Sequence, residues 1–206
     1  MRINEEEHPY FQIIETELQR IDDLLLDLLN ISKPKTDELC MVDLKQLVEK
    51  TIELMQPKAI ISNAMIVFDY EETFSYSIYG SYNRLKQMLI NLLKNAIESI
   101  ETSNFIFVSL HYKNDSIQLS IKDRGKGMDT TTLETIFNPF YTTKETGTGL
   151  GLILVQSVVA EHNGTIQIES EQGVGTTFLI DFKVMPNDIQ KRSQIQYSNE
   201  LYSKLS

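Results

Sequence analysis

Residues 105–123, FIFVSLHYKNDSIQLSIKD, contain two stretches in which apolar and polar residues alternate. Lys113, Asn114 and Asp115 separate these stretches, so the pattern predicts a β-hairpin. Side chains along a strand point alternately to the two faces of a sheet, and one face of this hairpin is therefore apolar. Such a face needs a cover of helices or of a second sheet, which limits the chain to layered folds.

Further extended patterns lie on both sides of this hairpin. A second hairpin is predicted over residues 165–184, with its turn around Gly173, Val174 and Gly175. Shorter alternating patterns predict strands over residues 65–71 and 74–80.

Helical patterns are interleaved with the strands. The apolar spacing predicts helices over residues 43–56, 81–100 and 151–164, and a short helix over 131–137. Asp43 is the expected N-cap of the first helix, and Gly164 the residue that ends the third. Helices and hairpins in this order predict an α/β fold, a two-layer α/β sandwich with the helices on one face of the sheet.

A heptad pattern marks the N-terminal part of the chain. Over residues 8–33 the apolar residues recur at alternating spacings of three and four: Phe11, Ile14, Leu18, Ile21, Leu25 and Leu28. This spacing forms one seam on a helix, and such a helix needs a partner helix from this chain or another. Pro34 is expected to end it, with a polar linker over 33–42. We predict three parts: this helix within residues 1–34, a folded domain over 35–185 and a loose polar tail over 186–206.

Charge and cysteine content exclude several classes of function. The 206 residues carry a formal net charge of −10, and because nonspecific nucleic-acid binding needs clustered Lys and Arg, we expect no nucleic-acid partner. The single cysteine, Cys40, excludes a disulfide framework and a Cys-based metal site within one chain. No apolar run approaches the roughly 20 residues of a membrane span. We expect a soluble, cytoplasmic chain or a soluble piece of a longer protein.

Residues 124–151 are rich in Gly and Thr and too long to be an ordinary connection. The region begins with DRGKGM, residues 123–128, and closes with TGTGLGL, residues 146–152, which runs directly into a predicted helix. Flexible glycine backbone and the free N–H groups at a helix start together form an anion site, to which Lys144 adds a mobile charge. Asp123, at the end of a predicted strand, is suited to accept a hydrogen bond from an exocyclic amine such as that of adenine.

This loop has two other interpretations. The sequence GTGLG is G-x-G-x-G rather than G-x-G-x-x-G, and the charged TTKET precedes it, so a Rossmann fold lacks its required context. Taken alone, the glycines are also compatible with two plain turns of an α/β domain that bind nothing.

Asn91 and Asn95 stand four residues apart in the predicted helix 81–100 and therefore point to the same side. They flank the predicted buried stripe of that helix, which consists of Leu85, Leu89, Leu92, Ala96 and Ile100. Amide oxygens at the border of core and solvent can coordinate a hydrated Mg²⁺, which takes few protein ligands beside phosphates. The alternative is that both amides only cap neighbouring backbone groups.

Taken in order, these motifs resemble the C-terminal catalytic, ATP-binding domain of bacterial sensor histidine kinases. RLKQMLINLLKNAIES resembles the N box of that family, DRGKGM and GTGLGL its two glycine boxes, FNPFYTTK its F box and GVGTTF its closing strand motif. The family shares a superfamily and the Bergerat-type ATP-binding fold with type II topoisomerase (gyrase) and mismatch-repair ATPases. The resemblance covers about residues 43–184. The helix 8–33 resembles the second helix of the dimerisation and phosphotransfer hairpin, especially that of sporulation-type kinases.

The resemblance implies a role for each matching residue. Asn95 would ligate Mg²⁺ with Asn91 in support, and Asn91 and Lys144 would act in catalysis. Asp123 would accept the adenine amine. The complete implied nucleotide site is Asn91, Asn95, Asp123, Gly125, Gly127, Met128, Phe137, Phe140, Thr143, Lys144, Gly147, Thr148, Gly149, Leu150, Gly151, Leu152 and Thr176.

Within that set, several residues have finer expected roles. Gly125 and Gly127 would let the backbone pass the base, and Thr176 would bind near the adenine through water. Lys144 and the amides of residues 147–152 would hold the phosphates. Phe137 and Phe140 would anchor a mobile lid.

Asn91 also bears on the reaction. In the related ATPases a Glu at this position activates water, and an amide cannot act as a general base. The resemblance therefore implies slow hydrolysis and transfer of the γ-phosphoryl group to a protein histidine. Of the three histidines, His111 and His162 lie where structural roles are expected, and His8 is followed by Pro9 and not by the acidic residue that follows a phosphoacceptor in the family. The acceptor is expected outside this chain, which alone should not phosphorylate itself.

The expected cofactors and partners follow from the resemblance. They are ATP with Mg²⁺, a histidine-bearing hairpin of the same or another kinase chain, a response regulator, and a second copy of the chain where the hairpin is complete. The chain would be cytoplasmic, alone or as part of a membrane-anchored sensor. The alternative function is an acceptor-less regulatory protein of the same fold that docks on a kinase or a response regulator. A Ser/Thr-directed anti-sigma kinase fits less well, because it needs no heptad helix.

Overall fold

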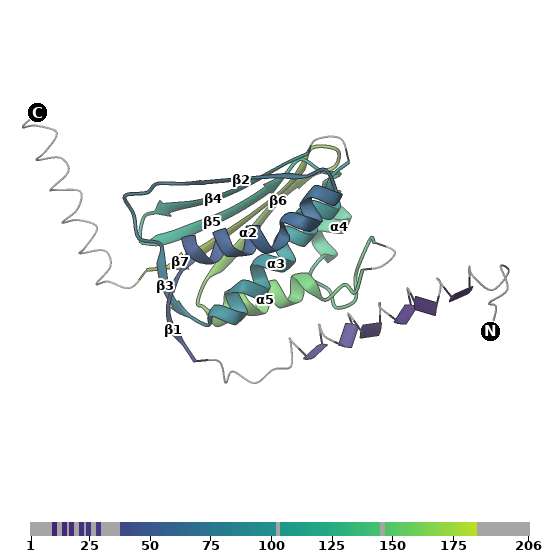
Figure 1. Ribbon diagram of the computed structural model, residues 1–206, viewed down its shortest axis with the longest axis horizontal. Coiled ribbons are helices and arrows are strands. Elements are labelled where there is room, and N and C mark those ends of the chain that lie inside the picture. Colours follow the sequence, from purple (N-terminus) through teal and green to yellow (C-terminus); the bar gives the residue numbers. More distant parts are fainter. Residues whose placement is uncertain are drawn as a thin grey trace, which may run out of the picture.

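The computed structural model describes residues 38–101, 104–144 and 147–184, together with residues 10, 11, 14, 15, 17, 18, 21, 22, 24, 25, 28 and 29. It has two layers, a five-stranded sheet with the long helices α2, α3 and α5 on one face (Figure 1). This confirms the predicted α/β sandwich. Buried residues of the strands alternate with more exposed ones, and the buried set packs against the helices in one core.

The five-stranded sheet has the order β2-β4-β5-β7-β6. Its strands are β2 (Met65–Tyr70), β4 (Phe105–Lys113), β5 (Ser116–Asp123), β7 (Gly175–Lys183) and β6 (Thr165–Glu171). β2 and β4 are parallel, and every other neighbouring pair is antiparallel. Both predicted hairpins, β4–β5 and β6–β7, are confirmed. The order places the end of β5 beside the start of β7.

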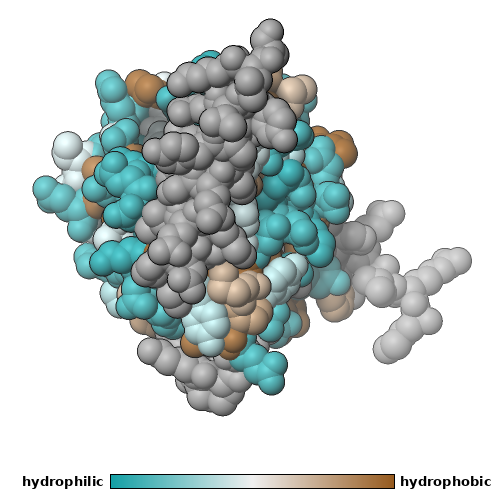
Figure 2. Space-filling model, turned by 90° about the vertical axis from the view of Figure 1, so that its left-hand side faces the viewer, coloured by the Kyte–Doolittle hydropathy of each residue, from teal (hydrophilic) through white to brown (hydrophobic). Residues whose placement is uncertain are grey.

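A second, two-stranded sheet pairs β1 (Cys40–Asp43) with β3 (Ser77–Gly80). The sequence placed residues 40–42 in a linker, which was wrong, because pairing with β3 satisfies the backbone and buries Val42. The strand predicted over residues 74–80 is also shorter than expected. Figure 2 shows the molecule from the left-hand side of Figure 1. The coloured surface in this view is mostly hydrophilic, with scattered hydrophobic residues.

Helix α2 (Leu44–Ile61) begins at its predicted cap, since Asp43 accepts a hydrogen bond from the Gln46 N–H. The helix extends beyond the predicted end and contains Pro57. Proline removes one helical hydrogen bond. Met55 and Ala59 on either side are buried in the core, and their burial offsets that loss.

Helix α3 (Tyr82–Ser99) carries the two asparagines. Ser81 caps its start by accepting a hydrogen bond from the Arg84 N–H. The predicted stripe faces the core: Leu85, Leu89, Leu92 and Ala96 are buried, and Ile100 is partly buried. Asn91 and Asn95 are half-buried at its edge, as the sequence predicted.

The other helices are α4 (Thr130–Thr135), capped by Asp129, and α5 (Gly151–Glu161). Gly164 was predicted to be the residue that ends α5, and this was wrong, because His162 caps the helix and Asn163, the next residue, has the positive φ of 52°. A Cβ on Gly164 would lie 2.9 Å from the Asp181 carbonyl oxygen, so close packing accounts for this glycine.

Every described residue between 10 and 29 is helical, as the heptad pattern predicted. The six seam side chains are exposed in the single chain: Phe11, Ile14, Leu18, Ile21, Leu25 and Leu28. His8, residues 33–37 of the linker and the tail 186–206 lie outside the described residues. No helix among the described residues is long and apolar enough to cross a membrane.

Candidate functional site

A cavity of about 430 Å³ lies where α3, the end of β5, the glycine-rich loop and the start of α5 meet. Most of the predicted site residues line it: Asn91, Asn95, Asp123, Gly127, Met128, Thr143, Lys144, Gly147, Thr148, Gly149, Gly151, Leu152 and Thr176. The lining does not include Gly125, Phe137, Phe140 and Leu150. The structure thus gathers residues from positions 91 to 176 around one hollow of the size that small-molecule ligands occupy.

Asp123 is a buried carboxylate at one wall of the cavity. Its Oδ1 accepts hydrogen bonds from the Gly125 N–H at 2.9 Å and the Thr176 N–H at 3.3 Å. Burial raises the pKa of Asp123 above its usual value, although hydrogen bonds from Gly125, Ser99 and Thr176 act against that rise. These contacts fix the orientation of the carboxyl group, so it can serve as a directional acceptor for a donor on a ligand.

Gly125 and Gly127 are explained by contacts behind the cavity. A Cβ on Gly125 would lie 2.2 Å from the Ser99 carbonyl oxygen, and one on Gly127 would lie 1.9 Å from that of Glu171. Gly127 also has a φ of 61°, which favours glycine. The sequence assigned both glycines to close passage of a ligand, but the packing of the loop on α3 and β6 already requires them.

Thr176 lies at the start of β7 beside Asp123. Its side chain is buried, and its Oγ1 hydrogen-bonds with Ser170 Oγ at 2.9 Å. The cavity lining also includes apolar side chains that the sequence analysis did not identify, namely Ile90, Ile136 and Phe178. An oriented carboxylate beside apolar side chains suits a flat, partly polar ring.

The Asn91 amide is oriented by its own helix. Its Nδ2 donates to the Gln87 carbonyl at 3.0 Å, which is the backbone-capping role left open by the sequence. Its Oδ1 faces the start of α5, because a Cβ on Gly151 would lie only 2.8 Å from that oxygen. The capping bond therefore leaves one amide oxygen directed at the first residue of α5.

The Asn95 amide oxygen accepts a hydrogen bond from Lys144 Nζ at 2.9 Å. The same ammonium group contacts Glu98 Oε2 at 2.6 Å, and the other oxygen of Glu98 contacts Lys58 Nζ at 2.5 Å. Glu98 lines the cavity and was not among the predicted site residues. Its position on the same side of α3 as both asparagines was the only signal that the sequence offered.

The charges of this cluster depend on one another. Burial acts to raise the pKa of Glu98, but hydrogen bonds from Lys144 and Lys58 outweigh it and leave the pKa below its usual value. Burial lowers the pKa of Lys144, and the nearby Lys94 and Lys126 lower it further, against the opposite effect of Glu98. Three lysines thus approach one cavity in a chain of net charge −10.

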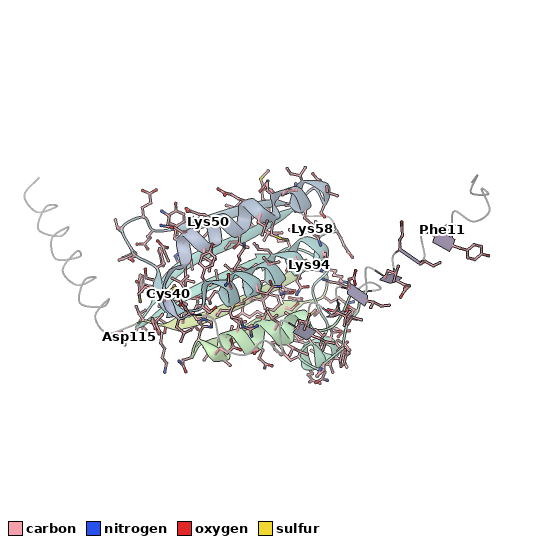
Figure 3. All side chains as sticks on the ribbon, turned by 60° about the horizontal axis from the view of Figure 1, so that its bottom comes forward. Phe11, Cys40, Lys50, Lys58, Lys94 and Asp115 are labelled. Atoms are coloured by element: carbon pink, nitrogen blue, oxygen red, sulfur yellow. The ribbon has the colours of Figure 1, made fainter. Side chains whose placement is uncertain are left out.

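Lys94 and Lys126 were not predicted as site residues, although they lie inside the N box and the first glycine box. Figure 3 shows Lys94 on α3 and Lys58 on α2 at the same end of the two helices. Helix α5 begins at this cavity without a side-chain cap. Positive side chains and uncapped helix N–H groups make the region suited to an anion.

The loop between α4 and α5 contributes Tyr141, Thr142 and Thr143 to the lining of the cavity. Phe137 is half-buried, whereas Phe140 is 62% exposed and has a φ of 66°. Gly149 packs on the Phe140 backbone, since a Cβ there would lie 2.4 Å from the Phe140 carbonyl carbon. Leu150 is buried, so its side chain belongs to the core.

The amino-acid sequence of this chain is similar to a known protein family and to individual proteins. Residues 80–186 match the family described as histidine kinase-, DNA gyrase B-, and HSP90-like ATPase. Sporulation kinase E of Bacillus subtilis (strain 168) is 38% identical over 185 residues, which cover 89% of this chain and 25% of that kinase. The chain therefore spans a quarter of the length of this relative.

Two solved structures share the fold at recognisable sequence identity. The catalytic domain of histidine kinase ThkA, in a nucleotide-free form, has a TM-score of 0.63 and 28% identity, and the match covers 73% of this chain and 99% of that domain. ThkA in complex with the response regulator protein TrrA has a TM-score of 0.73 and 27% identity, over 91% of this chain and 54% of that one.

Proposed function

Because the chain belongs to the histidine kinase-, DNA gyrase B- and HSP90-like ATPase family, we propose that it binds ATP with Mg²⁺ and transfers the γ-phosphoryl group to a protein histidine. Membership confirms the family that the ordered boxes predicted. The activity is our inference from the chemistry of the cavity and from relatives that are histidine kinases.

The adenine ring would lie at the Asp123 wall. The Asp123 carboxylate accepts a hydrogen bond from the exocyclic amine, and Thr176 lies next to it to bind through water. Ile90, Ile136 and Phe178 provide apolar contacts for the faces and edges of the ring. A guanine ring carries a carbonyl in place of that amine, so it would leave the buried carboxylate without its donor.

The phosphates would lie between α3 and the start of α5. Lys144, Lys94 and Lys126 supply positive charge, and the uncapped N–H groups of α5 supply donors. The Asn95 oxygen already holds an ammonium group, so it is placed to ligate a cation. Mg²⁺, when bound, would neutralise phosphate charge, and it suits this site because it uses few protein ligands beside phosphate oxygens.

One observation most supports transfer of the phosphoryl group to a protein rather than hydrolysis of ATP. Both carboxylates that line the cavity in the described part of the chain are already engaged by other groups of the protein. Among the described residues, only Asp123 and Glu98 bring carboxylates to the cavity lining. Asp123 is held at the adenine wall by backbone N–H groups, and Glu98 is held by two lysines. At the position where the related ATPases carry a water-activating Glu, this chain has Asn91, and its amide cannot remove a proton from water.

The acceptor would be a histidine on a separate helical hairpin. The exposed seam of residues 10–29 offers the apolar surface on which such a hairpin, or a second copy of the chain, would pack. By analogy with ThkA, which was solved in complex with the response regulator TrrA, a response regulator would be the next partner. The reaction would take place in the cytoplasm. The alternative remains an acceptor-less protein that docks on a kinase or a response regulator without transferring phosphate.

The decisive experiment supplies the chain with radiolabelled ATP, Mg²⁺ and a separate polypeptide that carries a histidine hairpin. We expect acid-labile, base-stable label on the hairpin and none on the chain alone. Nucleotide binding without any transfer to a set of such hairpins would favour the docking alternative. Label on the isolated chain that disappears in His8→Ala would place the acceptor here and contradict the proposal.

A further inference from the structure

We propose that Glu98 is a positioning residue that holds the Lys144 ammonium group against Asn95 in the nucleotide-free protein. When nucleotide binds, Lys144 would leave Glu98 and Asn95 and pair with the phosphates. The proposal rests on the proposed ATP-binding function and concerns how the same site is prepared. Glu98 itself would touch neither the nucleotide nor the reacting atoms. It would act through Lys144, a residue of the loop between α4 and α5 that contacts both Asn95 and Glu98 on α3.

The first observation is that one ammonium group joins two side chains of α3. Lys144 Nζ lies 2.9 Å from Asn95 Oδ1 and 2.6 Å from Glu98 Oε2. The side chains of Lys144 and Glu98 are 29% and 26% exposed, so water screens the pair only in part. Because Lys144 belongs to the loop and Glu98 to α3, this ion pair fastens the loop over the cavity.

The second observation concerns the loop around Lys144. The Lys144 N–H donates to Thr142 Oγ1 at 3.1 Å, and the Lys144 carbonyl accepts from the Gly147 N–H at 3.2 Å. These local bonds make a compact turn, and the Lys144 side chain connects this turn to Asn95 and Glu98 on α3. Holding that side chain therefore holds the turn, and releasing it frees the turn.

The third observation is a conflict over the Asn95 oxygen. This oxygen cannot face an ammonium group at 2.9 Å and ligate a metal ion at the same time, because the two cations would repel each other at very short range. Lys144 must leave Asn95 before the oxygen can ligate Mg²⁺. The phosphates that arrive with the metal give Lys144 a new anionic partner.

The fourth observation is that Glu98 keeps a partner when Lys144 leaves. Lys58 contacts Glu98 Oε1, whereas Lys144 contacts Oε2, so the two ion pairs use different oxygens. Lys58 projects from α2, which packs on α3 as part of the core, and does not move with the loop. Departure of Lys144 therefore leaves Glu98 neutralised and does not leave a half-buried charge unpaired.

The test compares three variants with the wild-type chain: Glu98→Gln, Lys144→Met and the matched control Lys58→Met. The first readout is hydrogen exchange of residues 138–149 without nucleotide. We expect both Glu98→Gln and Lys144→Met to increase exchange there by roughly fivefold, the effect of losing about 1 kcal/mol of local closure. Lys58→Met should leave exchange in this segment unchanged, because it keeps the Lys144 contact.

The second readout is calorimetry with a nonhydrolysable ATP analogue and Mg²⁺. Glu98→Gln should bind the analogue more tightly by roughly three- to tenfold, because Lys144 no longer has to be released from an ion pair. Lys144→Met should bind it more weakly, because the phosphates lose a cation. The two variants thus change loop exchange in the same direction and affinity in opposite directions. A purely structural role for Glu98 would not produce this combination.

Glu98→Asp provides the rescue control, since it keeps the charge and should restore most of the loop protection. Unchanged loop exchange in Glu98→Gln, or equal loosening in Lys58→Met, would overturn the proposal. Thermal unfolding of each variant identifies any general loss of stability. Failure of the wild-type chain to bind the analogue would instead refute the proposed function, so the two failures are distinguishable.

Discussion

The His162 imidazole accepts a hydrogen bond from the backbone N–H of Ser81 through Nε2, at 3.0 Å. Its Nδ1 lies 2.7 Å from the Val158 carbonyl, so the ring donates to α5 and accepts from the residue that caps α3. Gly80 leaves room for the ring, because a Cβ there would lie 2.3 Å from His162 Cδ2. The contact joins the end of α5 to the start of the helix that carries both asparagines.

Replacing His162 should therefore weaken the fold. We expect His162→Ala to lower the free energy of unfolding by about 1–3 kcal/mol, because it removes the hydrogen bond from the Ser81 N–H to the imidazole and opens a space beside Phe182. Urea denaturation measures the loss. The matched control is His111→Ala, whose exposed side chain should contribute little. Equal stability of the two variants would show that the Ser81 contact is unimportant.

The Asp123→Asn variant should lose affinity for adenine nucleotides. An amide can still accept from Gly125 and Thr176, but it is a weaker acceptor than a carboxylate for the adenine amine. We expect affinity for an ATP analogue to fall by roughly 10- to 100-fold, the value of a hydrogen bond to a charged group. Calorimetry checks this. Unchanged affinity would mean that the base lies elsewhere in the cavity.

Although Asp123→Asn should lose nucleotide affinity, it should gain stability relative to the wild-type chain as the pH rises. Burial raises the pKa of Asp123, so the folded state binds this proton more tightly than the unfolded state does. Ionisation of Asp123 therefore costs folding free energy as the pH rises from the usual aspartate range through the raised pKa. Asn carries no such cost. We expect the melting temperature of Asp123→Asn, relative to wild type, to be higher at pH 7 than at pH 3, a difference that thermal scans at both values would measure.

The Asn95→Ala variant tests the metal site. The amide oxygen that accepts from Lys144 is the only protein ligand proposed for Mg²⁺, so its removal should abolish most of the gain in affinity that Mg²⁺ gives to an ATP analogue. Binding measured with a chelator in place of Mg²⁺ is the internal control, and it should change little. Retention of the full Mg²⁺ effect would show that the metal is held by other groups.

The sequence predicted the parts of the structure that depend on local pattern. The period of α3 placed its leucines in the core and both asparagines at the edge, and the hairpins followed from alternation. Strand β1 was missed because its partner β3 lies more than 30 residues further along the chain. Pro57 was expected outside a helix, but burial on both sides of it, which no local pattern reveals, keeps α2 continuous.

The candidate site likewise contains residues that local motifs predict and residues that they do not. Asp123, Asn95 and the glycines could be found because ordered motifs contain them. Glu98 could not be recognised as part of the site, since its partners Lys58 and Lys144 are 40 and 46 residues away in the sequence. Gly125 was assigned to the site for a ligand contact, whereas the Ser99 carbonyl behind it accounts for the absence of a side chain.

The seam of residues 10–29 should be needed for phosphotransfer but not for nucleotide binding. Leu18 is 58% exposed in the single chain, and a carboxylate at its position would remain charged and could not be buried against a partner helix. We expect Leu18→Asp to abolish transfer to a separate histidine hairpin while calorimetry shows unchanged affinity for an ATP analogue. Asp22→Ala, which alters an exposed residue off the seam, is the matched control and should transfer normally. Normal transfer by Leu18→Asp would mean that the acceptor docks on another surface, and loss of nucleotide binding in that variant would mean that the seam packs on the catalytic domain itself.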